Sequence, residues 1–315
     1  VHSSFKKYIC ARPKKRLQVY DLPQKTIANS ATISGIGLHS GKPSKLTFQP
    51  AGENHGIFFR RTDVKGKPEI MAHIDYVSDT QRGTTLSDGP ISVATVEHVL
   101  AAVAGLQIDN IMIDVEGEEM PIMDGSAMPF IERLEHCGIV EQNEPKNILN
   151  IHQRISHGDL ETNSVIEVEP ADEFSVNVVI DYDSQLIDTQ SVRLPAITDF
   201  RDFFANCRTF CFLHELEALH KAGLIKGGSL DSAVVMVEKE LKGEKIEELR
   251  KLFNKPKIKV EKGILNNTKL RFPDEPARHK LLDVVGDLAL LGATIKGKIS
   301  AYKPGHKLCL LYTSD

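Results

Sequence analysis

The chain has 315 residues, 41% of them hydrophobic and 26% charged, which is typical of a globular protein with room for two domains. Its formal net charge of −4 gives no reason to expect nucleic acid as a partner, and no run approaches the roughly 18 apolar residues of a membrane-spanning helix. Five cysteines, an odd number without a CxxC pair, favour reduced thiols in a cytoplasmic protein over a disulfide framework.

The pattern of regular elements begins after a basic N-terminal stretch. Residues 1–23 are rich in Lys and Arg and lack the apolar core of a signal peptide, so we expect a disordered extension. Strand-like alternation follows in TIANSATISGIGLHSGKPSKLTFQP, with Gly and Ser at the turns. A helix is predicted at about 93–106, then the strand NIMIDVEG, and a second helix after the loop PIMDGSAMPF. The first domain is predicted to span residues 24–143.

The same order of elements then recurs. The polar stretch EQNEPKN, broken by Pro145, predicts a linker. Three strands precede a helical region at about 197–222, and the strand SAVVMV, the helix in RHKLLDVVGDLALLG and the strand KGKISAYKPG follow. KLTFQPA and VIEVEPA resemble the same strand end, which indicates two copies of one α+β unit. The second domain is predicted to span residues 146–310.

One predicted helix carries polar residues in an apolar run. In RHKLLDVVGD, His279, Asp283 and Asp287 are each four residues apart and therefore lie on one stripe of the helix. A buried carboxylate is costly unless it is paired or binds a metal. The stripe therefore needs a partner from elsewhere in the chain.

Two other histidine-containing stretches could supply that partner. Glu97 and His98 are adjacent in TVEHVLAA, and Gly305 places His306 on a turn in KPGH. A His–Asp pair with a third ligand can hold a catalytic metal ion, and a neighbouring Glu can act as a general base toward water. From spacing alone a salt bridge or a helix cap remains open, because one HxxxD pair is common among twelve histidines.

Seven ordered motifs carry a family resemblance. The chain, from about residue 24 to 307, resembles the UDP-3-O-acyl-N-acetylglucosamine deacetylases, the zinc enzymes of the committed step of lipid A biosynthesis. The motifs are SGIGLHSGK, TVEHVLAAVAGLQIDN, PIMDGSAMPF, CRTF, GLIKGGSLD, RHKLLDVVGDLALLG and AYKPGH.

The resemblance implies a role for each polar residue of these motifs. The Zn²⁺ ligands would be His98, His279 and Asp283. Glu97 would be the general base, and a protonated His306, paired with Asp287, would donate to the leaving amine and stabilise the oxyanion. Thr209 of CRTF would also face the oxyanion.

The resemblance also implies a substrate site. Lys280 would meet the nucleotide phosphates, and Tyr182 would lie against the uracil. An apolar passage for the acyl chain is implied in the second domain, although the same residues could be ordinary core. Its lining positions would be Leu213, Leu216, Ile225, Ser229, Leu230 and Val235.

The chain departs from the family at two places. Gly83 stands where some members carry a cysteine near the metal, so no thiol ligand is expected. The family's C-terminal tail is nearly absent, and the motifs are similar to those of the variant fused to a 3-hydroxyacyl carrier-protein dehydratase. A fused or separate dehydratase is therefore a possible partner.

We thus expect an α+β protein of two similar domains, each a small sheet packed on helices, with the active site at their interface. The expected reaction is zinc-dependent hydrolysis of the N-acetyl group of a UDP-linked, 3-O-acylated amino sugar, releasing acetate. Two alternatives are another metal-dependent amidohydrolase and a non-catalytic nucleotide- or lipid-binding relative.

Overall fold

The computed structural model describes residues 22–184, 186–221, 225–239, 241, 243–253, 256–261, 263–265 and 269–314. The disordered extension expected at residues 1–23 lies outside these residues up to position 21. The first strand, β1, spans Pro23–Ile27.

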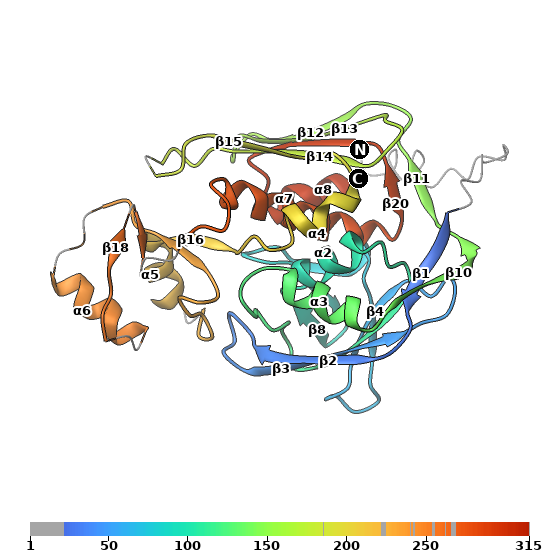
Figure 1. Cartoon of the computed structure of the whole chain (residues 1–315), viewed down its shortest axis with the longest axis horizontal. Helices are drawn as coiled ribbons and strands as arrows, with labels where there is room; N and C mark the ends of the chain where they lie inside the picture. Colours follow the sequence, from blue (N-terminus) through green and yellow to red (C-terminus); the bar gives the residue numbers. More distant parts are fainter. Residues whose placement is uncertain are drawn as a thin grey trace.

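Two five-stranded sheets of the same topology form the outer layers of the molecule (Figure 1). In each, two antiparallel hairpins flank a central strand that runs antiparallel to one neighbour and parallel to the other. This duplication confirms the prediction of two similar α+β units, and the boundaries at 143 and 146 stay a prediction. The first sheet has the order β2 (Ala31–Ile36), β3 (Pro43–Pro50), β9 (Ile111–Glu116), β4 (Ile57–Arg61) and β5 (Glu69–Met71). The second has the order β12 (Ile155–Asp159), β13 (Ser164–Glu169), β21 (Lys298–Tyr302), β14 (Ser175–Ile180) and β15 (Gln190–Leu194).

Helices fill the space between the two sheets (Figure 1). In each half, one helix precedes the central strand and another follows it. The strands alternate buried and partly exposed residues, so that each sheet turns one apolar face toward the helices. The helices are α2 (Glu97–Gly105) and α3 (Met128–His136) in the first half, and α7 (Glu275–Leu288) and α8 (His306–Ser314) in the second.

Helices α2 and α7 cross at close range, and a glycine makes this possible. A Cβ atom added at Gly286 would lie 2.1 Å from the backbone oxygen of Glu97. Any larger residue would push α7 away from α2. Residues 97 and 98 of one helix are thereby held against the 279–287 stripe of the other.

Shorter strands pair outside the two large sheets. Strand β1 pairs antiparallel with β10 (Ile139–Pro145), and β11 (Ile148–Asn150) pairs in parallel with β20 (Thr294–Lys296). Most of EQNEPKN thus belongs to β10, and the expected linker is wrong because backbone pairing at a polar sheet edge leaves no hydrophobic signal. A three-stranded sheet of β6 (Val77–Asp79), β7 (Thr85–Asp88) and β8 (Ile91–Ala94) precedes α2.

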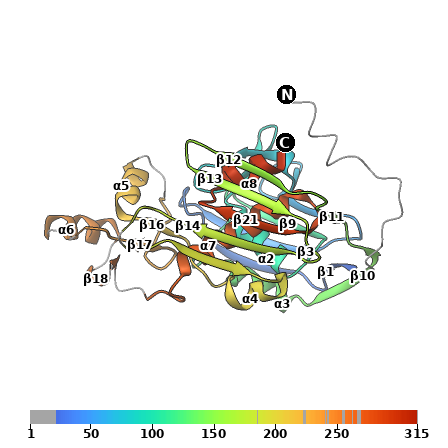
Figure 2. The ribbon, with the colours of Figure 1, turned by 90° about the horizontal axis from the view of Figure 1, so that it is seen from above.

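The helical region predicted at 197–222 is broken into several short elements. It contains η2 (Ile197–Asp199), α4 (Phe200–Phe203), β16 (Phe210–Phe212) and α5 (Leu213–Lys221). An insertion protrudes beyond the layered body (Figures 1 and 2), with a separate hydrophobic cluster of its own. Its other elements are β17 (Val234–Met236), α6 (Gly243–Leu252), β18 (Val260–Glu261) and β19 (Ile264–Leu265).

Two short 3₁₀ helices complete the described fold: η1 (Ile74–Tyr76) before β6 and η3 (Ala289–Leu291) after α7. None of the helices in the described part of the chain has both the length and the apolar character needed to cross a membrane.

Candidate metal and catalytic site

Three buried side chains from α2 and α7 converge as a potential metal-binding cluster. His98, His279 and Asp283 offer ligand atoms that all lie within 4.8 Å of one another. Nε2 of His279 is 3.4 Å and Nε2 of His98 is 3.7 Å from Oδ1 of Asp283, and the two rings are nearly perpendicular, with centroids 5.1 Å apart. The structure therefore brings together the three predicted ligands, two of them from the polar stripe of α7.

The protonation states of these residues suit a cation. Burial lowers the pKa of His98 to about 3, and burial also lowers the pKa of His279, so both imidazoles are neutral at physiological pH. Nδ1 of His279 lies 3.0 Å from the backbone oxygen of Cys207 and must donate to it, which leaves the Nε2 lone pair free for a metal.

The ionisation and hydrogen bonding of the Asp283 carboxylate show whether a metal ion fits this cluster. Burial would raise the pKa of this carboxylate, but the neighbouring imidazole of His279 and the ammonium group of Lys280 outweigh burial and hold the pKa well below its usual range. Oδ2 accepts a hydrogen bond of 2.9 Å from Nζ of Lys280, whereas Oδ1 is buried without a hydrogen-bond partner among the described residues. An unpaired, ionised oxygen beside two neutral imidazoles is the donor set that a divalent cation such as Zn²⁺ takes.

Glu97 lies next to this cluster at the start of α2. Its side chain is buried, and Oε2 accepts a 2.9 Å hydrogen bond from the backbone N–H of Thr84. Burial raises the pKa of Glu97 to about 7, although the positive charge of the nearby His306 acts to lower it. A carboxyl group with a pKa near neutrality can accept and return a proton. A divalent cation nearby would lower that pKa and favour the ionised form that accepts the proton.

The third member of the α7 stripe holds a histidine. Oδ2 of Asp287 lies 2.8 Å from Nδ1 of His306, and Oδ1 accepts a 2.7 Å hydrogen bond from Oγ1 of Thr84. Burial alone would lower the pKa of His306, but the charge and hydrogen bond of Asp287 raise it to about 9. His306 is therefore a cation at neutral pH, with Nδ1 donating to Asp287.

A cavity of about 360 Å³ opens beside these groups. It has a polar end and an apolar end. The metal-binding cluster, Glu97, His306, Thr209 and Lys280 all line the polar end. Burial would lower the pKa of Lys280, but Asp283 outweighs burial and raises it, so Lys280 is a fixed positive charge in the wall.

The apolar end of the cavity extends into the insertion. Four of the predicted acyl-passage residues, Leu216, Ile225, Ser229 and Val235, line it. Leu213 and Leu230 are not among the lining residues and are buried in the hydrophobic cluster of the insertion, which also contains Leu216 and Val235.

Tyr182 lies outside the cavity lining and is 38% exposed. Its ring packs edge-on against Phe210 and Phe212, with both centroid distances 5.6 Å. Burial of the hydroxyl raises its pKa, so the tyrosine is neutral.

Sequence reasoning missed two polar residues of this site. Thr84 contacts both Glu97 and Asp287, and no spacing in the sequence indicates this because the contacts join residues far apart in the chain. His39 lines the cavity, and both its ring nitrogens are buried without hydrogen-bond partners in the part of the chain that the structure describes. His39 lies in SGIGLHSGK, and the match of this stretch to a family motif is the sequence feature that could have identified it.

Comparison with known proteins gives consistent results. A profile of the family described as UDP-3-O-acyl N-acetylglycosamine deacetylase matches residues 24–251 and 253–313. A bifunctional enzyme LpxC/FabZ of Chlorobaculum tepidum is 46% identical over 287 residues, covering 90% of this chain and 62% of that protein. A second LpxC/FabZ enzyme, of Bacteroides thetaiotaomicron, is 44% identical over 288 residues, covering 91% and 62%. A UDP-3-O-acyl-N-acetylglucosamine deacetylase of Anaeromyxobacter sp. is 42% identical over 287 residues, covering 90% and 85%. The chain thus spans under two thirds of the length of the two bifunctional relatives.

Proposed function

This chain belongs to the UDP-3-O-acyl N-acetylglycosamine deacetylase family, and from that premise we propose that it removes the N-acetyl group of UDP-3-O-acyl-N-acetylglucosamine. The products are UDP-3-O-acyl-glucosamine and acetate, in the committed step of lipid A biosynthesis. The observation that carries the proposal is the ionised, unpaired Oδ1 of Asp283 between two neutral imidazoles, next to Glu97 and at the end of an apolar cavity.

In this proposal Zn²⁺ is held by His98, His279 and Asp283. When bound, the cation supplies Lewis-acid chemistry, polarising the amide carbonyl and lowering the pKa of water from about 15.7 to about 7. The site would lie at the interface of the two domains, for which we propose the ranges 24–143 and 146–310, because α2 precedes the central strand of one sheet and α7 that of the other.

The side chains of the site carry the proton transfers. Glu97 takes a proton from water as the water oxygen attacks the amide carbon, forming the new C–O bond. His306, charged through Asp287, and the hydroxyl of Thr209 donate hydrogen bonds to the developing oxyanion. His306 then gives its proton to the nitrogen as the C–N bond breaks, releasing the amine and acetate. The pKa of Glu97, raised to about 7, supports its role as the base that accepts a proton. The pKa of His306, raised to about 9, supports its role as the acid that is protonated before the reaction.

The substrate is proposed to lie along the cavity. Its 3-O-acyl chain would follow the apolar end past Leu216, Ile225, Ser229 and Val235, with Leu213 and Leu230 in the same hydrophobic cluster as Leu216 and Val235. Lys280 would face the phosphates as a fixed cation. For Tyr182 we propose contact with the uracil, supported by the partial exposure of this residue.

We also propose a cytoplasmic location, supported by the free thiols of the described residues Cys137, Cys207, Cys211 and Cys309. A carrier-protein dehydratase, fused or separate, is proposed as a partner on the strength of the bifunctional relatives' names.

Acetate release from two substrates tests this function. The purified chain should deacetylate UDP-3-O-acyl-N-acetylglucosamine, lose the activity when the metal is stripped and regain it with Zn²⁺. The same nucleotide sugar without the acyl chain should react orders of magnitude more slowly, because each buried methylene contributes about 0.8 kcal/mol. Equal rates for both would favour an amidohydrolase with a soluble substrate, and binding of the first without acetate release would favour a non-catalytic relative.

A further inference from the structure

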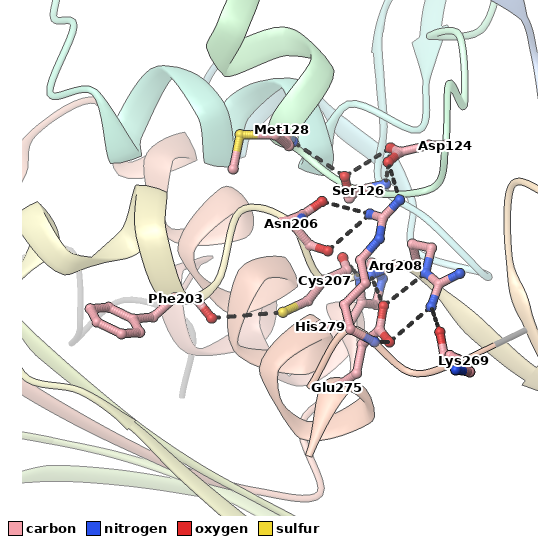
Figure 3. A network of polar contacts seen from close by, with 11 residues as sticks. Asp124, Ser126, Met128, Phe203, Asn206, Cys207, Arg208, Lys269, Glu275 and His279 are labelled. Atoms are coloured by element: carbon pink, nitrogen blue, oxygen red, sulfur yellow. Dashed lines mark hydrogen bonds and ion pairs between the residues drawn. The ribbon is translucent and has the colours of Figure 1, made fainter. Parts of the chain in front are cut away.

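A buried ion pair lies beside the metal-binding cluster and takes no part in the proposed proton transfers. Glu275, at the first turn of α7, is 1% exposed, and the side chain of Arg208 is 9% exposed. Figure 3 shows the two residues facing each other directly next to His279. Glu275 precedes His279 by four residues, so the two lie one turn apart on the same face of the helix.

Glu275 binds the backbone as well as the side chain of Arg208. Oε1 accepts hydrogen bonds from the backbone N–H of Arg208 (3.0 Å) and from its Nε (2.9 Å). Oε2 accepts from the other end of the guanidinium (3.1 Å) and from the backbone N–H of Arg271 (2.7 Å). The guanidinium also donates to the backbone oxygen of Lys269 at 2.8 Å. One carboxylate thereby fixes segment 207–209 against the start of α7.

The two neighbours of Arg208 both belong to the site. The backbone oxygen of Cys207 accepts the hydrogen bond from Nδ1 of His279, which turns Nε2 toward the cluster. Thr209 lines the polar end of the cavity. A shift of residue 208 would therefore rotate the ring of a metal ligand and move the hydroxyl proposed to face the oxyanion.

A second set of contacts supports the same segment from the other side (Figure 3). Arg271 donates to the backbone oxygen of Asn206 (3.0 Å) and to Asp124 (2.8 Å), and Asp124 also accepts from Ser126. The backbone N–H of Thr209 donates to the backbone oxygen of Gly125 at 2.8 Å. Segment 206–209 is thus held between the loop before α3 and the start of α7, and from α7 both Glu275 and His279 contact it.

We infer that Glu275 is a positioning residue of the metal centre: its carboxylate, through Arg208, aligns the carbonyl of Cys207 with His279 and places Thr209. For Thr209 this inference rests on the proposed function, because the role of its hydroxyl is itself proposed. For His279 it rests on the hydrogen bond to the carbonyl of Cys207 alone. A buried ion pair is weak evidence for stability, since apolar residues of similar volume often serve as well. Its four directed hydrogen bonds specify a geometry that apolar packing would not.

Glu275→Gln tests this, with Arg208→Lys as a milder second variant. The first keeps the size and removes the charge; the second keeps the charge and the backbone hydrogen bond but lacks the forked guanidinium. The matched control is Asp109→Asn, because Asp109 also accepts from a backbone N–H, that of Lys25, and pairs with a buried cation, Lys146. Asp109 follows the end of α2 opposite Glu97 and His98 and does not line the site cavity.

The measurement is the dissociation constant of Zn²⁺, from competition with a chromophoric chelator at a temperature where circular dichroism shows every variant folded. We expect Glu275→Gln to weaken zinc binding by about 10- to 100-fold, as for other groups that orient a ligand histidine, with a smaller loss in Arg208→Lys and none in Asp109→Asn. Deacetylation should show a lower kcat with unchanged KM in Glu275→Gln.

Zinc affinities of Glu275→Gln and Arg208→Lys equal to that of the unaltered chain would overturn the inference, as would an equal loss in Asp109→Asn. If Glu275→Gln does not fold, Arg208→Lys against Asp109→Asn decides by the same criterion. Zinc binding that depends on Glu275 in a chain without deacetylase activity would refute the proposed function and leave the positioning of His279 intact.

Discussion

Replacing Asp287 by Asn should shift the pH at which the enzyme loses activity in alkali. The side chain keeps its shape and an oxygen that can accept from Nδ1 of His306, but it loses the charge that stabilises the imidazolium. The pKa of His306 is raised from 6.5 to about 9, which at 1.36 kcal/mol per pKa unit corresponds to about 3 kcal/mol in favour of the protonated form. Without the carboxylate, burial is opposed by the smaller effects of Glu97 and Asp283, and the pKa should fall toward 6.5.

The sign of the effect follows from the acid role of His306. Activity requires the protonated ring and is lost as the pH rises through its pKa, so the alkaline limb of kcat/KM should move down by about two pH units or more. A ring with a pKa of about 6.5 is only about 3% protonated at pH 8, so kcat/KM at pH 8 should fall roughly 30-fold, with a smaller loss at pH 6. The limbs belong to the coupled site and only approximately to one residue.

The assay is kcat/KM against pH with zinc content measured in parallel. Thr84→Val is the matched control, because it removes the other hydrogen bond to Asp287 and leaves the carboxylate charge; its alkaline limb should not move down. His306→Ala should flatten the alkaline limb and keep zinc. An alkaline limb that stays near pH 9 in Asp287→Asn would refute the electrostatic reasoning, and loss of zinc in His306→Ala would make His306 a ligand.

Three further outcomes are expected. The His279→Ala, Asp283→Ala double variant should lose bound zinc, and unchanged zinc content on metal analysis would contradict the ligand assignment. Glu97→Ala should keep zinc, lower kcat by roughly 10²- to 10⁴-fold and flatten the acid limb, because the proton acceptor is gone; a lost alkaline limb instead would reverse the roles. Ser229→Trp should fill the apolar end of the cavity and selectively lower kcat/KM for long-chain substrates, whereas equal effects on short and long chains would make this segment ordinary core.

The two large sheets were predictable from repeated sequence patterns, whereas the short strands that pair at sheet edges were not. Alternating residues in β3 and β13 revealed the half-buried central region of each sheet, where one face is apolar. The helix predicted from residue 93 begins only at Glu97, because residues 91–94 pair with β7 as strand β8. The strands of the insertion are two or three residues long, too short for a periodic signal.

The part of the site that lies on one helix was predictable from the sequence. A four-residue spacing placed His279, Asp283 and Asp287 on one stripe, and the structure puts all three beside α2. Thr84 was not predictable, because its contact with Asp287 joins positions 203 residues apart and depends on how α2 and α7 cross. The sequence does not tell whether an apolar residue lines the cavity, as Leu216 does, or lies outside its lining, as Leu213 does, because both have the same apolar pattern.

Titration of the metal-free chain with Zn²⁺ shows whether one ion held by His98, His279 and Asp283 is required for amide hydrolysis. Bound zinc and acetate release from UDP-3-O-acyl-N-acetylglucosamine are measured on the same samples. Both should rise together and reach a plateau at one equivalent, while His279→Ala shows neither at that concentration. Acetate release at full rate before zinc is added, or a plateau in activity that does not follow zinc occupancy of this site, would contradict the account.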